Sequence, residues 1–348
     1  MTPVPSVSVI VLTYNARHFV AECLNALETQ TFTDFETILV DNASLDRTAE
    51  YVREHFPRVR LVASRSNGGY GAGNNLGASC ATGDILVFLN PDTVPACDWL
   101  ANLIGGMRRH RCRFATSKIV LQSDPERLNS AGNEIHFVGL SFCRGVNAPA
   151  RDYDKLEFVS GASGAACAIG RELFARIGGF DPSFFLYHDD VDLSLRALLA
   201  GEHCLYVPTA RVAHNYDLSL PPMKWTWIEA HRYAVLLKAL RPRTLLVLLP
   251  AFIVVDVMTF AYLTSRGPRF VAAKMFSYGW LLRHTAAILR GRRRMQAVRC
   301  VSDRQLLTAL ASSIPYEQLN SGWLGRLASV CVDPWLRAYR GLSLRLVD

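Results

Sequence analysis

Acidic side chains occur at three points of the sequence where they could bind a ligand or move a proton. Asp41 and Asp46 flank a polar turn, Asn90-Pro91-Asp92 follows an apolar run, and residues 188–192 read His-Asp-Asp-Val-Asp. A carboxylate beside a diphosphate can hold Mg²⁺ or Mn²⁺. A carboxylate within hydrogen-bond reach of a hydroxyl can act as a general base. These segments are therefore the candidates for chemistry.

Each segment also fits a purely structural role. Asp46 fits a helix cap as well as a ligand contact, whereas Asp41 at a strand end is better placed to accept a hydrogen bond from a ligand. Asn90-Pro91-Asp92 fits a proline turn, and acids such as those of residues 188–192 are favoured in the first turn of any helix. His214 fits a metal ligand or a buried histidine. Taken singly, the segments leave both interpretations open.

Residues 67–75 are rich in glycine and asparagine and lead into a helical pattern. Glycines let backbone amides approach a phosphate, and a helix N-terminus adds positive potential. The segment matches neither a Walker loop nor a GxGxxG fingerprint. Because turns are rich in glycine anyway, the segment alone is a weak signal of a phosphate site.

Short apolar runs alternate with helical patterns over the first ninety residues. We expect strands at 7–12, 36–40, 59–63 and 85–89, with helices between them. This alternation predicts βαβ units and a mostly parallel α/β sheet. Ligands bind such sheets beyond the carboxyl ends of the strands, which is where residues 13–15, 41–46 and 90–92 fall. A further strand is expected at 204–208, with His214 after it.

The last third of the chain has a different composition. Arginine and lysine crowd there among apolar stretches, so the formal charge of +8 is not spread evenly along the chain. This pattern favours anionic lipid over nucleic acid. Leu245–Leu263 is long enough to cross a bilayer, but Pro250 and an unpaired Asp256 equally favour a buried or interfacial helix. Phe270–Leu289 predicts an amphipathic interfacial segment. We therefore expect an α/β domain at 1–220 and a helical, membrane-associating region at 221–348.

The nine cysteines are scattered and include no CxxC pair. This pattern favours mostly buried thiols in a reducing compartment over a disulfide framework. Residues 1–5 contain neither the basic segment nor the apolar run of a signal peptide. The sequence therefore predicts a cytoplasmic location.

Taken together and in order, these segments resemble the family 2 glycosyltransferases, which have the GT-A fold. The resemblance rests on Val9–Asn15, Val40–Asp46, Asn67–Asn75 and Leu89–Asp92. Residues 178–181 (Gly-Gly-Phe-Asp) and 185–193, with His214, are similar to the rhamnosyltransferase-type branch. The resemblance covers about residues 6–217.

The resemblance implies a role for each polar cluster. Thr13, Asn15 and Asp41 would hold the nucleotide base and ribose, and the glycine loop would lie beside the diphosphate. The complete implied set for the donor is Thr13, Asn15, Asp41, Asp46, Asn67, Gly69, Asn74 and Asn90. Asp92 and His214 would bind a divalent metal, Mg²⁺ or Mn²⁺. Asp190 would be the catalytic base, with Asp189 replacing the family's usual Glu, and Asn90 replaces the first acid of the DxD-type motif.

The implied activity is metal-dependent, inverting transfer of a sugar from a nucleotide-diphosphate donor. The branch suggests dTDP-L-rhamnose as donor and a glycan or polyprenyl-diphosphate-linked saccharide as acceptor, in cell-surface polysaccharide synthesis. Together with the basic, apolar last third, this places the protein peripherally or shallowly inserted at the cytoplasmic face of the plasma (inner) membrane. A homo-oligomer is an open expectation, and no nucleic-acid partner is expected.

Three alternatives remain at this point. A UDP-sugar could replace the dTDP-sugar. A non-catalytic nucleotide-sugar-binding scaffold would account for Asn90 in the metal motif. A nucleotidyltransferase would need a second metal carboxylate near Asp92, which the sequence does not offer, and would leave the pair Asp189-Asp190 unexplained.

Overall fold

The computed structural model describes residues 5–319 and 322–348. The cytoplasmic location is predicted from residues 1–5, of which residues 1–4 lie outside the described residues. The chain folds into two compact units. Unit 1 comprises residues 1–133, 143–197 and 202–217, and unit 2 comprises residues 134–142, 198–201 and 218–348. Two short segments from the first 220 residues therefore belong to unit 2. One of them is held there by a backbone hydrogen bond of 2.8 Å from Ala311 N to Ile135 O.

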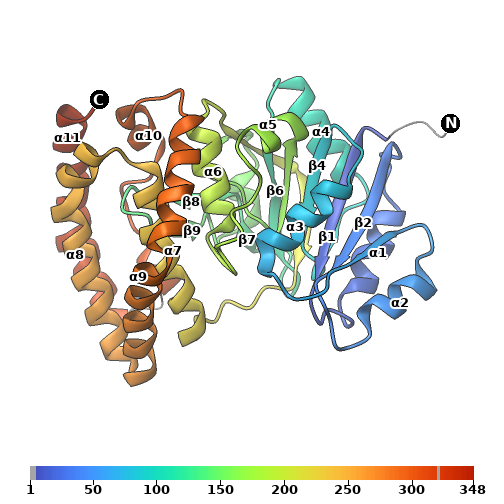
Figure 1. Ribbon diagram of the computed structural model, residues 1–348, viewed down its shortest axis with the longest axis horizontal. Coiled ribbons are helices and arrows are strands. Elements are labelled where there is room, and N and C mark those ends of the chain that lie inside the picture. The colour runs from blue at the N-terminus through green and yellow to red at the C-terminus, as the bar shows by residue number, and fades with distance from the viewer. Residues whose placement is uncertain (1–4, 320–321) are drawn as a thin grey trace. The chain divides into compact units, whose positions relative to one another are not determined.

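Unit 1 is built on a mixed sheet with the strand order β10-β12-β6-β11-β4-β1-β2-β3 (Figure 1). The first four strands along the chain are parallel: β1 (Val7–Thr13), β2 (Phe35–Asp41), β3 (Arg60–Ala63) and β4 (Ile85–Leu89). β11 (Ala166–Gly170) runs antiparallel between β4 and β6 (Phe114–Leu121), and β12 (Cys204–His214) is parallel to β6. The predicted mostly parallel α/β sheet is thus confirmed.

Shorter strands complete the sheet of unit 1. β5 (Thr93–Pro95) and β10 (Glu157–Val159) pair with β12, and β7 (Leu128–Ser130) pairs with β6. β8 (Asn133–Ile135) and β9 (Ser141–Cys143) form a separate two-stranded sheet.

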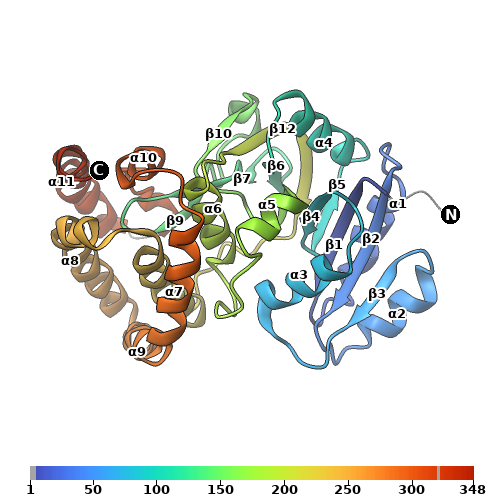
Figure 2. The same cartoon turned by 45° about the horizontal axis from the view of Figure 1, so that its top comes forward.

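Helices cover both faces of the strands β1, β2 and β4 (Figure 2). Side chains such as Val9 and Leu39 share one buried cluster with residues of α1 (Val20–Glu28), α2 (Thr48–His55) and α4 (Trp99–Arg109). On the opposite face, α3 (Gly69–Cys80) approaches so closely that a Cβ at Gly77 would lie 2.5 Å from Ile10 Cγ2. The sheet is therefore buried on both sides, as its apolar strands require.

The register of the parallel strands aligns their carboxyl ends. Thr13 is the pairing partner of Asp41, and Val11 is the partner of Leu89, directly before Asn90. The polar residues that follow these strands therefore emerge at one edge of the sheet. This edge is the ligand-binding edge of open parallel sheets.

The strand β12 corrects one expectation. It does not end at Pro208 but continues to His214, with a register shift between Val207 and Arg211. Proline has no N–H to donate to the sheet, so it is tolerated where an irregularity interrupts the pairing. His214 therefore ends a sheet strand instead of lying in a loop.

Unit 2 is helical. Its main helices are α7 (Pro222–Ala239), α8 (Pro242–Arg266), α9 (Pro268–Ala297), α10 (Asp303–Ala309) and α11 (Gly322–Leu346). The first three begin with proline, which is favoured at the first helical position because its missing N–H would have no partner there. α9 packs against α7 and α8, and α11 packs against α8 (Figure 1).

Charged side chains join α7, α8 and α9, with Glu229, Arg232 and Lys274 buried and Asp256 partly exposed. Lys274 contacts Glu229, and its Nζ lies 2.7 Å from Asp256 Oδ1. Arg232 binds Glu229 at 2.9 Å and lies 3.6 Å from Asp256 Oδ1, while the Tyr278 hydroxyl donates to Asp256 Oδ2 at 2.8 Å. The expectation that Asp256 is unpaired is therefore wrong. Two carboxylates face two cations, so the cluster carries no net charge, although Glu229 Oε1 and Arg232 Nε are buried without a hydrogen-bond partner among the described residues. Removing one member would leave a charge without its counter-ion.

Two further expectations concern α8 and the thiols. The most apolar 18-residue window of α8 has a mean hydropathy of 2.3, and 28% of it is buried; among the described residues α8 is the one helix long and apolar enough to cross a membrane. All nine cysteines are free, but only Cys23, Cys167 and Cys204 are buried. The expectation of mostly buried thiols is wrong, since Cys97 and Cys300, for example, are exposed in connecting segments, which run over the surface.

Candidate active site

The loops after β1 and β2 are tied to each other. The Thr13 hydroxyl donates to Val40 O at 3.2 Å, and the Leu45 amide donates to Asn15 Oδ1 at 2.8 Å. The Ser44 amide donates to Asp41 Oδ2 at 3.2 Å. Thr13 and Asp41 are buried and Asn15 is exposed with a φ of 51°, in the left-handed region that asparagine tolerates better than most residues. The residues proposed for the nucleotide thus form one fixed rim.

Several other predicted donor residues have structural contacts. Asp46 accepts from the amides of Arg17 and Thr48 at 2.9 and 3.1 Å, just before α2, whose N-cap residue is Arg47. Asn67 Oδ1 accepts from Asn42 Nδ2 at 2.8 Å and from the Gly69 amide at 2.9 Å. Asn74 is buried, and its side chain donates to Tyr70 O at 3.1 Å. These three side chains shape the loops around the candidate donor site.

Asp92 and His214 meet at the end of β12. His214 Nε2 lies 3.3 Å from Asp92 Oδ1, an oxygen that is buried without a hydrogen bond to the described residues. His214 Nδ1 lies 2.8 Å from the side-chain oxygen of Asn129. With the Asn129 oxygen facing Nδ1, a neutral imidazole would carry its proton on Nδ1 and present the lone pair of Nε2. An imidazole lone pair and a carboxylate oxygen that face each other fit a divalent cation.

This pair alone does not make a complete metal site. Within residues 5–319 and 322–348, no group of three or more His, Cys, Asp or Glu side chains is arranged to hold a metal ion. Asn90 replaces the first acid of the DxD-type motif and directly follows β4. Its backbone N–H donates to Ala165 O at 2.9 Å. A cation here would need further oxygen ligands from a substrate or water.

Asp190 is held at the start of α6 (Asp189–Leu199) by three donors. Its Oδ2 accepts from Asn133 Nδ2 at 2.8 Å and from the Gly164 amide at 3.0 Å, and its Oδ1 accepts from the Val191 amide at 2.9 Å. Asp190 remains partly exposed. The carboxylate is therefore fixed in position while part of the residue stays accessible.

Asp189 has a different environment. It is buried, and its Oδ1 has no hydrogen-bond partner among the described residues. Burial, reinforced by the neighbouring Asp190, raises the pKa of Asp189 well above its usual value. One of the two adjacent acids is thus a desolvated carboxyl group, and the other is an anchored carboxylate on a partly exposed residue.

The segment before α6 is anchored on α3. The Tyr70 amide donates to Phe185 O at 2.9 Å, and Asn75 exchanges two hydrogen bonds with the backbone of Phe180, at 2.8 and 2.9 Å. Gly69 has a φ of +82°, and a Cβ there would lie 2.2 Å from Phe185 O. The glycines of this loop therefore admit the 180–188 segment.

Sequence reasoning missed three residues around Asp190. Asn133 lies 57 positions before Asp190, and Gly164 and Tyr70 come from other parts of the chain. The Tyr70 hydroxyl donates to Gly164 O at 2.6 Å, next to the Gly164 amide that binds Asp190. No local sequence motif marks Asn133. Gly164, in contrast, lies in a glycine-rich turn at 161–164 that can be recognised in the sequence.

The sheet and its polar carboxyl edge have the GT-A fold, and comparisons with known proteins identify the class as a glycosyltransferase. The model of the family described as "Glycosyl transferase family 2" matches residues 8–178. The N-acetylglucosaminyl-diphospho-decaprenol L-rhamnosyltransferase of Mycobacterium tuberculosis is 27% identical over 230 residues, which cover 60% of this chain and 75% of the relative. The chain belongs to the family 2 glycosyltransferases.

Solved structures share the fold. The crystal structure of GalNAc-T7 with UDP, GalNAc and Mn²⁺ matches with a TM-score of 0.57 and 17% identity, over 83% of this chain and 58% of that one. The mannosyltransferase of Pyrobaculum calidifontis, in complex with GDP-Man and Mn²⁺, matches with a TM-score of 0.51 and 19% identity, over 95% and 88%. At these identities, the likeness concerns the fold alone.

The contact between Gly69 and Phe185 generates a prediction. In Gly69→Ala, the new Cβ would meet the Phe185 carbonyl and the backbone would be strained at its positive φ, so we expect a loss of about 2 kcal/mol or more in the free energy of unfolding. Denaturant unfolding measures this. The control is Gly105→Ala in α4, where a Cβ meets nothing within 4 Å. Equal stability of the two variants would contradict the proposed packing.

Proposed function

We propose that this protein is an inverting glycosyltransferase that moves L-rhamnose from dTDP-L-rhamnose to a hydroxyl of a lipid-linked saccharide. The observation that carries the proposal is Asp190, which is partly exposed and held by Asn133 and the Gly164 amide. The choice of donor and acceptor is supported by the mycobacterial relative, whose name specifies L-rhamnose and an N-acetylglucosaminyl-diphospho-decaprenol.

In the proposed reaction, Asp190 accepts the proton of the acceptor hydroxyl. The hydroxyl oxygen attacks the anomeric carbon, and the bond from that carbon to the diphosphate oxygen breaks. The attack comes from the face opposite the leaving group, so the single displacement inverts the configuration. A general base contributes about 10²–10⁴-fold to such a step. Thr13, Asn15 and Asp41 would position the nucleotide, and Asp189 would support the start of α6.

Asp92 and His214 are the residues that would hold Mg²⁺ or Mn²⁺. The unpartnered Oδ1 of Asp92 and the Nε2 lone pair of His214 fit such an ion. When bound, the ion stabilises the negative charge that develops on the leaving diphosphate. Two protein ligands are sufficient for this function if the donor diphosphate supplies further oxygens.

We also propose that unit 2 binds the cytoplasmic face of a membrane. An exposed apolar stripe runs along α8, with Leu246, Leu249, Ile253, Val257 and Phe260 from 40% to 70% exposed. Their spacing of three, four, four and three residues places them on one face of the helix. Arg241 and Arg266 flank α8 and would complement anionic headgroups. The nine free cysteines suit a reducing compartment.

The Asp190→Asn variant tests the transferase. We expect kcat to fall at least about 100-fold because the base is lost, while binding of the donor is retained. The measurement is transfer from a panel of dTDP-, UDP- and GDP-sugars with Mn²⁺, Mg²⁺ or EDTA. The control is Asp152→Asn, an exposed residue of a 3₁₀ helix. Donor binding without turnover in the wild type would favour a scaffold, and turnover of a UDP-sugar would replace the proposed donor.

Asn133 is predicted to be a positioning residue for Asp190. In Asn133→Ala, Asp190 loses a donor to its Oδ2, so we expect kcat to fall about tenfold while KM for the donor stays the same. The control is Asn102→Ala, which removes an amide that donates to Thr209 O at 3.0 Å elsewhere in unit 1. An unchanged kcat with reduced stability would show that Asn133 has only a structural role.

The stripe on α8 is tested with lipid vesicles. We expect the triple variant Leu246→Ser, Ile253→Ser, Val257→Ser to bind phosphatidylglycerol vesicles at least about tenfold more weakly, because each side chain would lose favourable apolar burial. Flotation on a density gradient measures the bound fraction. Matched controls are Leu45→Ser and Phe158→Ser, two exposed apolar positions of unit 1. Binding that resists the triple substitution would refute the membrane surface.

A further inference from the structure

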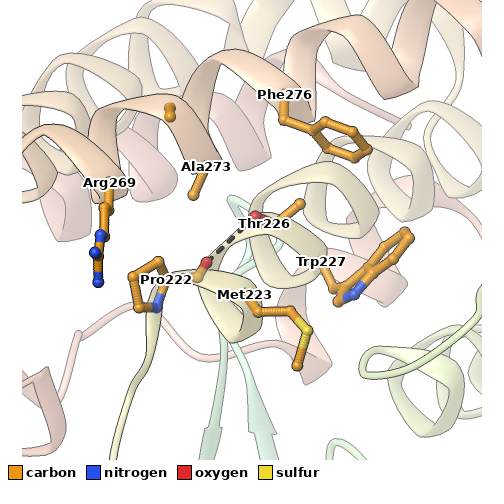
Figure 3. A pocket seen from close by; sticks show the side chains of 8 residues that line it. Pro222, Met223, Thr226, Trp227, Arg269, Ala273 and Phe276 are labelled. Atoms are coloured by element: carbon orange, nitrogen blue, oxygen red, sulfur yellow. Dashed lines mark hydrogen bonds between the residues drawn. The ribbon is translucent and has the colours of Figure 1, made fainter.

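A groove between the first turns of α7 and α9 has one charged end and one aromatic end. It is about 380 Å³ in volume and is lined by Pro222, Met223, Thr226, Trp227, Arg269, Ala272, Ala273 and Phe276. Arg269 stands beside Pro222 at one end, and Trp227 and Phe276 stand together at the other (Figure 3).

The lining is apolar apart from Arg269. The Thr226 hydroxyl donates to Pro222 O at 3.2 Å, so this hydroxyl is already used within α7. The neighbouring Arg266 stacks over Phe270, 5.5 Å from its ring centroid. On α9, the small side chains of Ala272 and Ala273 line the groove. The rings of Trp227 and Phe276 lie edge to face, with their centroids 6.4 Å apart. Arg269 is therefore the charged group of the groove.

An apolar lining with one cation at its end favours a ligand that is apolar along its length and anionic at one end. An extended peptide would need partners for its backbone N–H and C=O groups, and the Pro, Met, Ala and Phe side chains supply none. A chain without polar groups that ends in an anion fits both ends of the groove. From Arg269 to Phe276 the helix rises about 10 Å, which is enough for a short stretch of hydrocarbon.

We infer that this groove binds the phosphate-proximal part of a polyprenyl phosphate or diphosphate, with the phosphate at Arg269 and the chain over Trp227 and Phe276. The inference rests on the proposed function, which gives the protein a lipid-linked acceptor. It adds a site on unit 2 that holds one lipid molecule, as distinct from the α8 stripe, which contacts the bilayer as a whole. The exposed Met223 and Phe276 leave the groove open at its rim.

Equilibrium binding of undecaprenyl phosphate and uncharged undecaprenol to the full chain in detergent micelles tests the site. We expect Trp227→Ala and Phe276→Ala to weaken binding of both lipids about tenfold. Arg269→Ala is expected to weaken binding of the phosphate but not of the alcohol. The matched controls on α9 are Leu282→Ala for the apolar residues and Arg290→Ala for Arg269, because both lie exposed outside the groove.

The outcomes separate binding in this groove from nonspecific lipid binding and from recognition of the headgroup alone. If the control variants lose as much affinity as the groove variants, the lipid partitions onto the general apolar surface and the site is refuted. If inorganic pyrophosphate displaces the lipid completely and the aromatic variants bind normally, only the headgroup is recognised and the groove is also refuted. Binding needs no transfer, so a failure of the proposed rhamnosyl transfer would leave this measurement interpretable.

Discussion

The Phe185 carbonyl occupies the space in which a side chain of residue 69 would lie, and the arrangement of the candidate base depends on this approach. Through it, α3 receives the 180–188 segment and positions the start of α6. Asn75 fixes the same segment at Phe180. Tyr187 and His188 then adopt φ values of 64° and 63°. Left-handed residues of this kind persist where surrounding contacts determine them, and the α3 contacts supply that support.

The same contact gives the glycine-rich loop a structural role in place of the phosphate site that its sequence suggests. A glycine run at a helix start suggests a phosphate site when only the sequence is considered. In the structure, Gly69 and Gly71 make room for the protein itself, because a Cβ at Gly71 would lie 3.1 Å from Asp189 Oδ1. The loop therefore couples the donor side of the sheet to the paired acids. The proposed donor site and the proposed base share one helix as their support.

The parts of the fold that the sequence predicts are those with local patterns. Strand and helix alternation predicts β1 to β4, and the parallel pairing then aligns Thr13 with Asp41. The antiparallel insertion of β11 and the continuation of β12 past Pro208 depend on pairing between distant segments, which periodicity does not encode. Asp190 is visible as part of an acidic helix start. Asn133 is not, because its role arises only from the folded contact.

Unit 2 buries charged side chains between its helices and exposes apolar side chains on α8. In α7, α8 and α9, Glu229 and Lys274 are fully buried, while Leu246 and Val257 are 70% and 62% exposed. Soluble proteins rarely bury such charges unless they are paired. Here the pairing with Arg232 and Asp256 neutralises them, so no net charge from this cluster opposes contact of α8 with hydrocarbon. The internal ion pairs thus make the proposed membrane surface compatible with a helix that carries an aspartate near its middle.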